Sequence, residues 1–356
     1  MGFNGLFPHN RDNLEDFWGR RQNRPRFERT VQVFDRQIRV GSNDETVLSA
    51  VDNSLPLYSV VAPSDGAPFS VQFVVQAGPL DPGPPPENLS DYVQYTGEAA
   101  WLTIRLSAWG HCYIDLNDGH AVAVLSPRLA QRPDLVSLCL LNTILTNFFI
   151  GSGYGMLHAS CLLRNRRALL LLAPHNSGKS TTALRLALAG YQLVSDSMIF
   201  LSPASETVQL LGFPVGKVKL RGDMVAAFPL LHALLEVEPV RDETKYGVDL
   251  RRLDPGLVCD SAVTPEAIDL CLLTRSNGVA TRLMPATREA VVDAVTMNSL
   301  FLDTDSVWRR NLALIERLLE KARCYQLAIG SDADGILGAV NSLPLRNGFR
   351  WTAQPT

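Results

Sequence analysis

The stretch of sequence that decides the fold is Ala173-Pro174-His175-Asn176-Ser177-Gly178-Lys179-Ser180-Thr181. Before it, residues 168–172 form an apolar run of buried-strand length that ends in four leucines. After it, residues 182–188 have the pattern of an amphipathic helix. A Gly-Lys-Ser-Thr sequence between a strand and a helix is the context of a phosphate-binding loop. Ala173 stands where the usual motif has its first glycine.

Each residue type in this loop suits a phosphate group. Gly178 lets the backbone close around an anion, and the N–H groups at a helix start point at it. We expect Lys179 to bridge the β- and γ-phosphates of ATP and the Ser180 hydroxyl to ligate Mg²⁺. The predicted nucleotide-binding set is Asn176, Ser177, Gly178, Lys179, Ser180 and Thr181. The alternative is an apolar strand and a turn that happen to precede this tetrapeptide; the loop by itself does not separate a kinase from a hydrolase or a switch.

Two further residues are candidates for the chemistry. Asp196 is the next acidic residue and would lie at the end of the strand that follows the helix. A carboxylate at that position can hold Mg²⁺ or accept a proton from an attacking hydroxyl, although a strand-end aspartate is the simpler interpretation. His158 falls within an apolar run on an earlier predicted strand, where a hydrogen-bonded core histidine is the simpler interpretation.

Taken together, these segments resemble the catalytic domain of the HPr kinase/phosphorylase family. The resemblance rests on Leu157-His158-Ala159, on residues 173–181 and on residues 190–196, and it is closer to divergent relatives whose loop begins with Ala-Pro. It extends, in order but more weakly, over about residues 150–340. It implies a fold like that of phosphoenolpyruvate carboxykinases around the phosphate loop, and an ATP- and Mg²⁺-dependent kinase acting on a hydroxyl, usually serine. By position, Asp196 would be the general base and a metal ligand, and His158 would orient or tune it.

The sequence departs from the family's pattern in its acidic residues. Bifunctional members carry two adjacent aspartates where this chain has Asp196-Ser197. Their acidic Mg²⁺ ligand further along has no clear counterpart, because Lys217, Lys219 and Arg221 occupy that region. These differences argue against the reverse phosphorylase reaction and against HPr itself as the substrate. Arg221 and Lys245 are candidates for a second basic wall of the site.

The rest of the chain predicts a second, β-rich domain. We expect a polar N-terminal arm at residues 1–30, a β-rich domain at 31–130 and the kinase-like domain at 131–345, in an overall α/β (α+β) fold. Short alternating runs such as 31–34, 37–40, 57–61 and 71–75 predict strands, and Asn117-Asp118-Gly119 predicts a hairpin. The apolar stretch 135–150 is shorter than a membrane span, and its polar stripe predicts a buried amphipathic helix.

Composition excludes several classes of protein. Hydrophobic residues make up 46 % and charged residues 19 % of the 356, so the chain can bury a core and is not disordered throughout. The net charge of −3 gives no global field for nucleic acid or for an anionic membrane. Six cysteines without CxxC spacing argue against a disulfide framework, and no secretory signal is evident. We therefore expect a cytoplasmic protein.

Three functions remain open at this stage. The first is a serine kinase of a peptide or small protein, including precursor peptides of natural products. The second is a small-molecule kinase that uses the same loop. The third is a nucleotide-binding regulatory module that has lost catalysis. Relatives in the family form rings, so a homo-oligomer is a further expectation from the resemblance.

Overall fold

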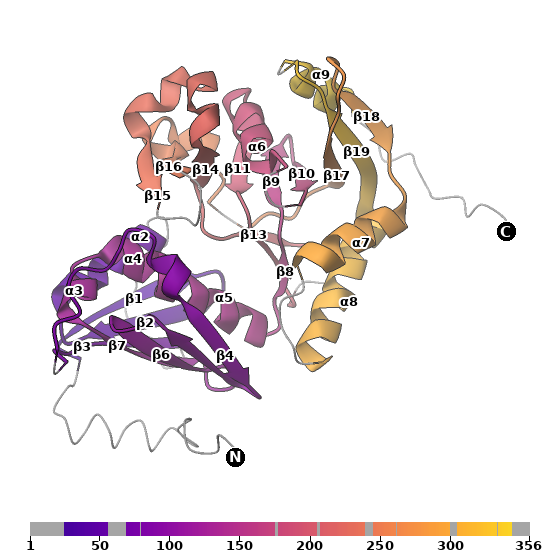
Figure 1. Cartoon of the computed structure of the whole chain (residues 1–356). Helices are drawn as coiled ribbons and strands as arrows, with labels where there is room; N and C mark the ends of the chain where they lie inside the picture. The colour runs from indigo at the N-terminus through magenta and orange to yellow at the C-terminus, as the bar shows by residue number, and fades with distance from the viewer. Residues whose placement is uncertain are drawn as a thin grey trace. The chain divides into compact units, whose positions relative to one another are not determined.

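The computed structural model is a mixed α/β structure with several sheets (Figure 1). It describes residues 25–55, 69–78, 80–174, 177–204, 207–238, 245–260, 262–299, 305–332 and 334–343. The chain divides into two compact units, and the division falls between Ser152 and Gly153. The domain limits drawn from the sequence stay a prediction.

The first unit is built on a seven-stranded mixed sheet. Its strand order is β1-β2-β3-β7-β6-β5-β4, in which β2, β3 and β7 are parallel and the other neighbours antiparallel. The strands are β1 (Phe27–Val33), β2 (Arg36–Ser42), β3 (Phe69–Val75), β4 (Gln94–Glu98), β5 (Trp101–Arg105), β6 (Gly110–Asp115) and β7 (His120–Leu125). Gly119 has a φ of 60° in the turn between β6 and β7, so the predicted hairpin is confirmed. The strand predicted at 57–61 lies outside the described residues.

Helices cover this sheet and close the first unit. They are α2 (Ser49–Ser54), α3 (Pro127–Ala130), α4 (Pro133–Val136), a π-helical turn η3 (Ser137–Leu141) and α5 (Asn142–Gly151), with 3-10 turns η1 (Glu45–Leu48) and η2 (Leu89–Tyr92). The rings of Phe148 and Phe149 on α5 contact Phe69 on β3, with centroids 4.9 and 5.8 Å away. These aromatic contacts tie α5 to the sheet.

The helical run Pro133–Gly151 is longer than the apolar stretch 135–150 that it contains. It has 19 residues and a mean hydropathy of 1.5, so length and composition alone would allow it to cross a membrane. However, 61 % of its most apolar window is buried inside the protein, as in the core helix of a soluble protein. The prediction of a buried helix is thus consistent with the structure, whereas the expectation that this segment is too short for a membrane span was wrong for the whole helical run, because Pro133 starts the helix before the apolar stretch.

The second unit has a six-stranded sheet at its centre. The strand order is β11-β9-β10-β17-β19-β18, with β10, β17 and β19 parallel. The strands are β9 (Ser160–Arg164), β10 (Arg167–Leu172), β11 (Gln192–Ser195), β17 (Ala267–Arg275), β18 (Arg282–Pro285) and β19 (Ala322–Ile329). Its helices are α6 (Lys179–Leu188), α7 (Arg288–Ser299), α8 (Asp305–Lys321) and α9 (Gly335–Asn341). Strand alternation turns Leu170 and Leu172 toward the core that they share with α7 and α8.

Two small sheets complete the second unit. One has the order β13 (Leu210–Gly212), β12 (Ile199–Leu201), β8 (Gly155–Leu157), and the other β14 (Lys217–Arg221), β16 (Lys245–Asp249), β15 (Glu236–Glu238). The 3-10 turns η4 (Gly222–Ala227) and η5 (Pro229–Leu234) lie between β14 and β15, and η6 (Leu250–Arg252) and η7 (Pro255–Leu257) lie between β16 and β17. The apolar run 157–163 is therefore not one strand: it is split between β8 and β9, which belong to different sheets. His158 lies in the connection and not on a strand.

All six cysteines are buried as thiols. They are Cys112, Cys139, Cys161, Cys259, Cys271 and Cys324. Burial raises the pKa of the Cys112, Cys161 and Cys271 thiols, and raises that of Cys324 to about 11. The absence of disulfides agrees with the expectation from cysteine spacing.

Candidate functional site

The predicted loop connects β10 to α6, as the sequence pattern requires. Strand β10 is buried from Ala168 to Leu172, and α6 begins at Lys179 directly after Gly178. Gly178 has a φ of 95°, and a Cβ built on it would meet nothing within 4 Å, so the glycine is required by its backbone conformation and not by crowding. The first N–H groups of an α-helix have no intrahelical acceptor. The first turn of α6 therefore offers N–H donors to an anion.

Lys179 is a buried lysine whose ammonium group makes no hydrogen bond to any residue that the structure describes. The residue is only 8 % exposed, and its Nζ has no hydrogen-bond partner among the described residues. Burial lowers the pKa of Lys179 to about 8, and the Asp196 carboxylate offsets part of that decrease. A buried ammonium group without a hydrogen-bond acceptor destabilises the folded protein. An anionic ligand would supply the missing acceptor, so this lysine indicates a binding site for an anion.

A cavity of about 130 Å³ opens beside Lys179, and we call it the Lys179 cavity. Its lining is rich in polar and basic groups: His158, Pro174, Ser177, Gly178, Lys179, Ser180, Thr181, Ser197, Lys219, Arg221 and Lys245. Lys219 and Arg221 come from β14, and Lys245 stands opposite Arg221 on β16. Arg221 is paired with Asp223 at 3.1 Å, outside the lining. The cavity therefore presents cations from two directions, α6 and the β14–β16 ladder.

Asp196 lies next to this cavity but is not part of its lining. It is 3 % exposed and follows β11, where Ser197 takes a positive φ of 91°. The Ser160 hydroxyl donates to its Oδ1 at 2.5 Å, and the Lys219 backbone N–H donates to its Oδ2 at 3.5 Å, at the outer limit of a hydrogen bond. Oδ1 therefore accepts a short hydrogen bond, whereas Oδ2 accepts only a long and weak one.

The structure brings most of the predicted site residues together. Among the predicted set, the cavity is lined by His158, Ser177, Gly178, Lys179, Ser180 and Thr181, and Asp196 lies within electrostatic reach of Lys179. Asn176 lies outside the described residues. Ser160, the hydrogen-bond donor to Asp196, is not among the predicted site residues. Lys219 had no predicted role, although strand alternation in residues 217–221 puts Lys217, Lys219 and Arg221 on one face.

The residues present fit Mg²⁺ held jointly with phosphates. Mg²⁺ is usually bound by one or two carboxylates, water and substrate phosphate oxygens, not by a cage of protein ligands. Within the described part of the chain, no group of three or more His, Cys, Asp or Glu side chains could hold a metal ion. The Ser180 hydroxyl and the Asp196 carboxylate are a donor set of that sparse kind.

No protein-family model and no curated protein matches the chain. Among solved structures, the Hpr(Ser) kinase/phosphatase from Coxiella burnetii aligns over 52 % of this chain and 93 % of that chain, with 15 % identity and a TM-score of 0.29. At this TM-score the alignment carries no argument about the function of the chain.

Proposed function

We propose that this chain binds Mg-ATP at the Lys179 cavity and transfers the γ-phosphate to a hydroxyl, a serine of a peptide or small protein. Precursor peptides of natural products are one such class of acceptor. The main support for this proposal is that the Lys179 ammonium group is buried and lacks a hydrogen-bond partner among the described residues. A triphosphate would supply acceptor oxygens to this group and to the N–H groups at the start of α6.

The phosphates would be bound from two sides, by the start of α6 and by the β14–β16 strand pair. The first turn of α6, with Gly178, Lys179, Ser180 and Thr181, would hold the phosphates from one side. Lys219 on β14 and Lys245 on β16 would face the charge from the other. Mg²⁺, held by Ser180, Asp196 and the phosphates, would neutralise charge on the phosphate oxygens.

Asp196 is the proposed general base. In the transfer, the acceptor oxygen forms a bond to the γ-phosphorus while the bond from that phosphorus to the β-phosphate oxygen breaks, and ADP leaves. The acceptor's hydroxyl proton would go to the Asp196 carboxylate. Because Ser160 holds Oδ1, the weakly occupied Oδ2 is the oxygen available for that proton.

A nucleotide-binding regulatory module is the second candidate. It is favoured by the burial of Asp196, which is 3 % exposed and absent from the cavity lining. In that case the chain would bind nucleotide without transferring phosphate, and substitution of Asp196 would leave no activity to lose.

The test measures binding and transfer separately. Mg-ATP is titrated calorimetrically into wild type, Lys179→Ala, Asp196→Asn and Lys321→Ala, the last being an exposed lysine at the end of α8. ADP release is followed with serine-containing peptides, with their alanine versions and with small hydroxyl compounds. We expect Lys179→Ala to weaken binding by roughly a hundredfold, and Asp196→Asn to keep binding but slow transfer by roughly 10²–10⁴-fold.

Each outcome decides between the candidates. Lys321→Ala should behave as wild type in both assays. Transfer to small hydroxyl compounds but not to peptides would replace the peptide acceptor by a small molecule. Binding without ADP release on any acceptor would favour the regulatory module, and the absence of Mg-ATP binding in wild type would refute both candidates.

A further inference from the structure

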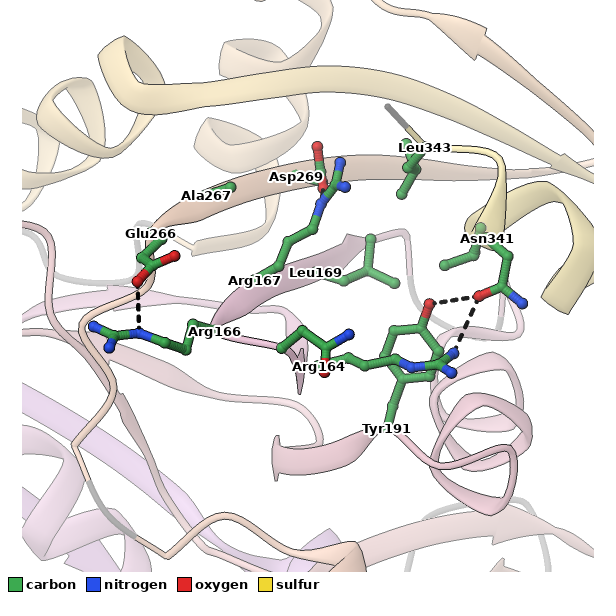
Figure 2. A pocket seen from close by; sticks show the side chains of 12 residues that line it. Arg164, Arg166, Arg167, Leu169, Tyr191, Glu266, Ala267, Asp269, Asn341 and Leu343 are labelled. Carbon is green, nitrogen blue, oxygen red and sulfur yellow. Dashed lines mark hydrogen bonds and ion pairs between the residues drawn. The ribbon is translucent and has the colours of Figure 1, made fainter. Parts of the chain in front are cut away.

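A second and larger pocket lies at the other end of β10. Its volume is about 500 Å³, and we call it the arginine pocket. Its lining is drawn from the β9–β10 turn, the start of β17, the residue before β11 and the end of α9: Arg164, Asn165, Arg166, Arg167, Leu169, Tyr191, Glu266, Ala267, Asp269, Val340, Asn341 and Leu343 (Figure 2). Arg167 starts β10 and Leu172 ends it, so at ~3.3 Å per residue about 17 Å of strand separate this pocket from the loop.

Arg164 brings a positive charge whose partners in the described part of the chain are Asn341 and Tyr191. Its Nη1 donates to Asn341 Oδ1 at 3.2 Å, and its guanidinium lies over the Tyr191 ring, 5.0 Å from the centroid (Figure 2). The Tyr191 hydroxyl donates to the same Asn341 oxygen at 3.1 Å. Among the described residues, the partners of Arg164 are therefore neutral. They hold the guanidinium in place at the pocket and leave its charge uncompensated.

Arg167 brings a second set of donors, which are only partly used. Its Nε donates to Asp269, which is fully buried and also accepts from Arg323 Nε at 2.9 Å. The Nη2 atom of Arg167 is buried and has no hydrogen-bond partner in the described part of the chain. A buried guanidinium nitrogen without an acceptor is costly to a fold, unless a ligand supplies the acceptor.

The charges of the lining favour an anion. Three arginines face two carboxylates, an excess of one positive charge, and Arg166 is already paired with Glu266 at 2.9 Å. The planar fork of an arginine matches the oxygens of a phosphate or a carboxylate. The pocket also offers the apolar side chains of Leu169, Val340 and Leu343, and its volume lies in the range of small-molecule sites.

We propose that the arginine pocket binds a small organic molecule through an oxyanion group, a phosphate or a carboxylate, that is held by Arg164 and Arg167. The organic part of the molecule lies against the apolar side chains of the lining. This site is separate from the Lys179 cavity, and its occupation does not depend on nucleotide binding.

The experiment uses three probes of the same ring size on the full chain. Phenyl phosphate, benzoate and phenol are titrated calorimetrically into wild type, Arg164→Gln, Arg167→Lys, Lys179→Ala and Arg282→Gln. Arg282 is an exposed arginine on β18 outside the lining and serves as the matched control for loss of charge. Arg164 is itself exposed, so its substitution should leave the fold intact, and circular dichroism checks this for every variant.

We expect one or both anions to bind saturably at up to millimolar concentration and phenol not to bind. Arg164→Gln should weaken the anion by roughly tenfold or more, and Arg167→Lys, which keeps the charge but loses the fork, by roughly fivefold. Lys179→Ala and Arg282→Gln should change nothing. The tighter of the two anions identifies the oxyanion.

Three results would overturn the proposal. One is the absence of saturable binding of both anions, and another is binding of phenol as tight as that of phenyl phosphate. The third is anion binding that Arg164→Gln does not weaken or that Lys179→Ala abolishes, because the probe would then occupy the Lys179 cavity. Failure of nucleotide binding in wild type leaves the arginine pocket unaffected.

Discussion

Replacing Lys179 by methionine should make the unliganded protein more stable. Methionine has nearly the same length and volume as the lysine stem, so the packing around residue 179 is retained while the buried charge is removed. The pKa of Lys179 falls from 10.5 to about 8, and each pH unit of that decrease corresponds to ~1.36 kcal/mol. The protonated lysine therefore costs the fold about 3 kcal/mol at pH 7, and Lys179→Met should recover about 2–3 kcal/mol.

The pH dependence of this gain has a definite sign. Because the folded pKa is lower than the unfolded one, the folded protein binds fewer protons than the unfolded chain between about pH 8 and 10.5. Wild type therefore gains stability from this group as the pH rises through that window, whereas the methionine variant does not. The difference between the two should be largest at pH 7 and should nearly disappear at pH 10.5.

The assay is urea unfolding at pH 7 and at pH 10, followed by circular dichroism, in the absence of nucleotide. Lys321→Met removes an exposed lysine at the end of α8 and should change the free energy of unfolding by less than about 0.5 kcal/mol. The reasoning would be refuted if Lys179→Met is no more stable than wild type at pH 7, or if its advantage is the same at both pH values.

Four other substitutions test the packing of the second unit. Leu170→Ala should lose about 2–5 kcal/mol in urea unfolding because Leu170 is fully buried in the core, and a loss below 1 kcal/mol would contradict this placement. Gly212→Ala should lower the melting temperature, because its Cβ would clash with the Val194 carbonyl oxygen; an unchanged melting temperature would count against that close approach. Gly178→Ala has open space but a φ of 95°, so about 1–2 kcal/mol of backbone strain should weaken Mg-ATP binding in calorimetry, and unchanged binding would speak against a strained loop. Asp269→Asn removes the buried carboxylate that two arginines share and should lower the free energy of unfolding in urea by about 3–5 kcal/mol. A variant as stable as wild type would show that the fold does not need these ion pairs.

Local patterns predicted the parts of the fold that depend on neighbouring residues. Alternation in residues 31–34 and 37–40 predicted two strands, and β1 and β2 lie there, with Val31 paired with Ile38. The start of α6 at Lys179 follows from the glycine before it and the apolar pattern after it. In these cases the residues that interact are close in the sequence, so their spacing carries the information.

The sequence could not show where the chain changes from one sheet to another. Residues 157–163 form one apolar run because β8 and β9 are both buried, and burial has no periodicity that marks the break at His158 and Ala159. The arginine pocket had no local signal either. Its residues come from four separate segments, and only the paired strands bring Arg167 next to Asp269.

Of the candidate site, the sequence predicted the loop well and its surroundings poorly. The strand–loop–helix context located Lys179 and Ser180 directly. By contrast, Ser160 reaches Asp196 through the pairing of β9 with β11, a contact between residues far apart in the chain. A hydrogen bond of that kind leaves no trace in residue spacing.

Because all six cysteines are buried thiols, the rate at which each one is alkylated measures how often the structure around it opens. A thiol reacts with an alkylating reagent as the thiolate, and burial suppresses both its access and its ionisation until the surrounding structure opens. Cys112 and Cys139 lie in the first unit and the other four in the second, so peptide masses after alkylation separate the opening rates of the two units. A ligand that protects only the thiols of the second unit is bound there, and no label, dye or engineered residue is needed to detect it.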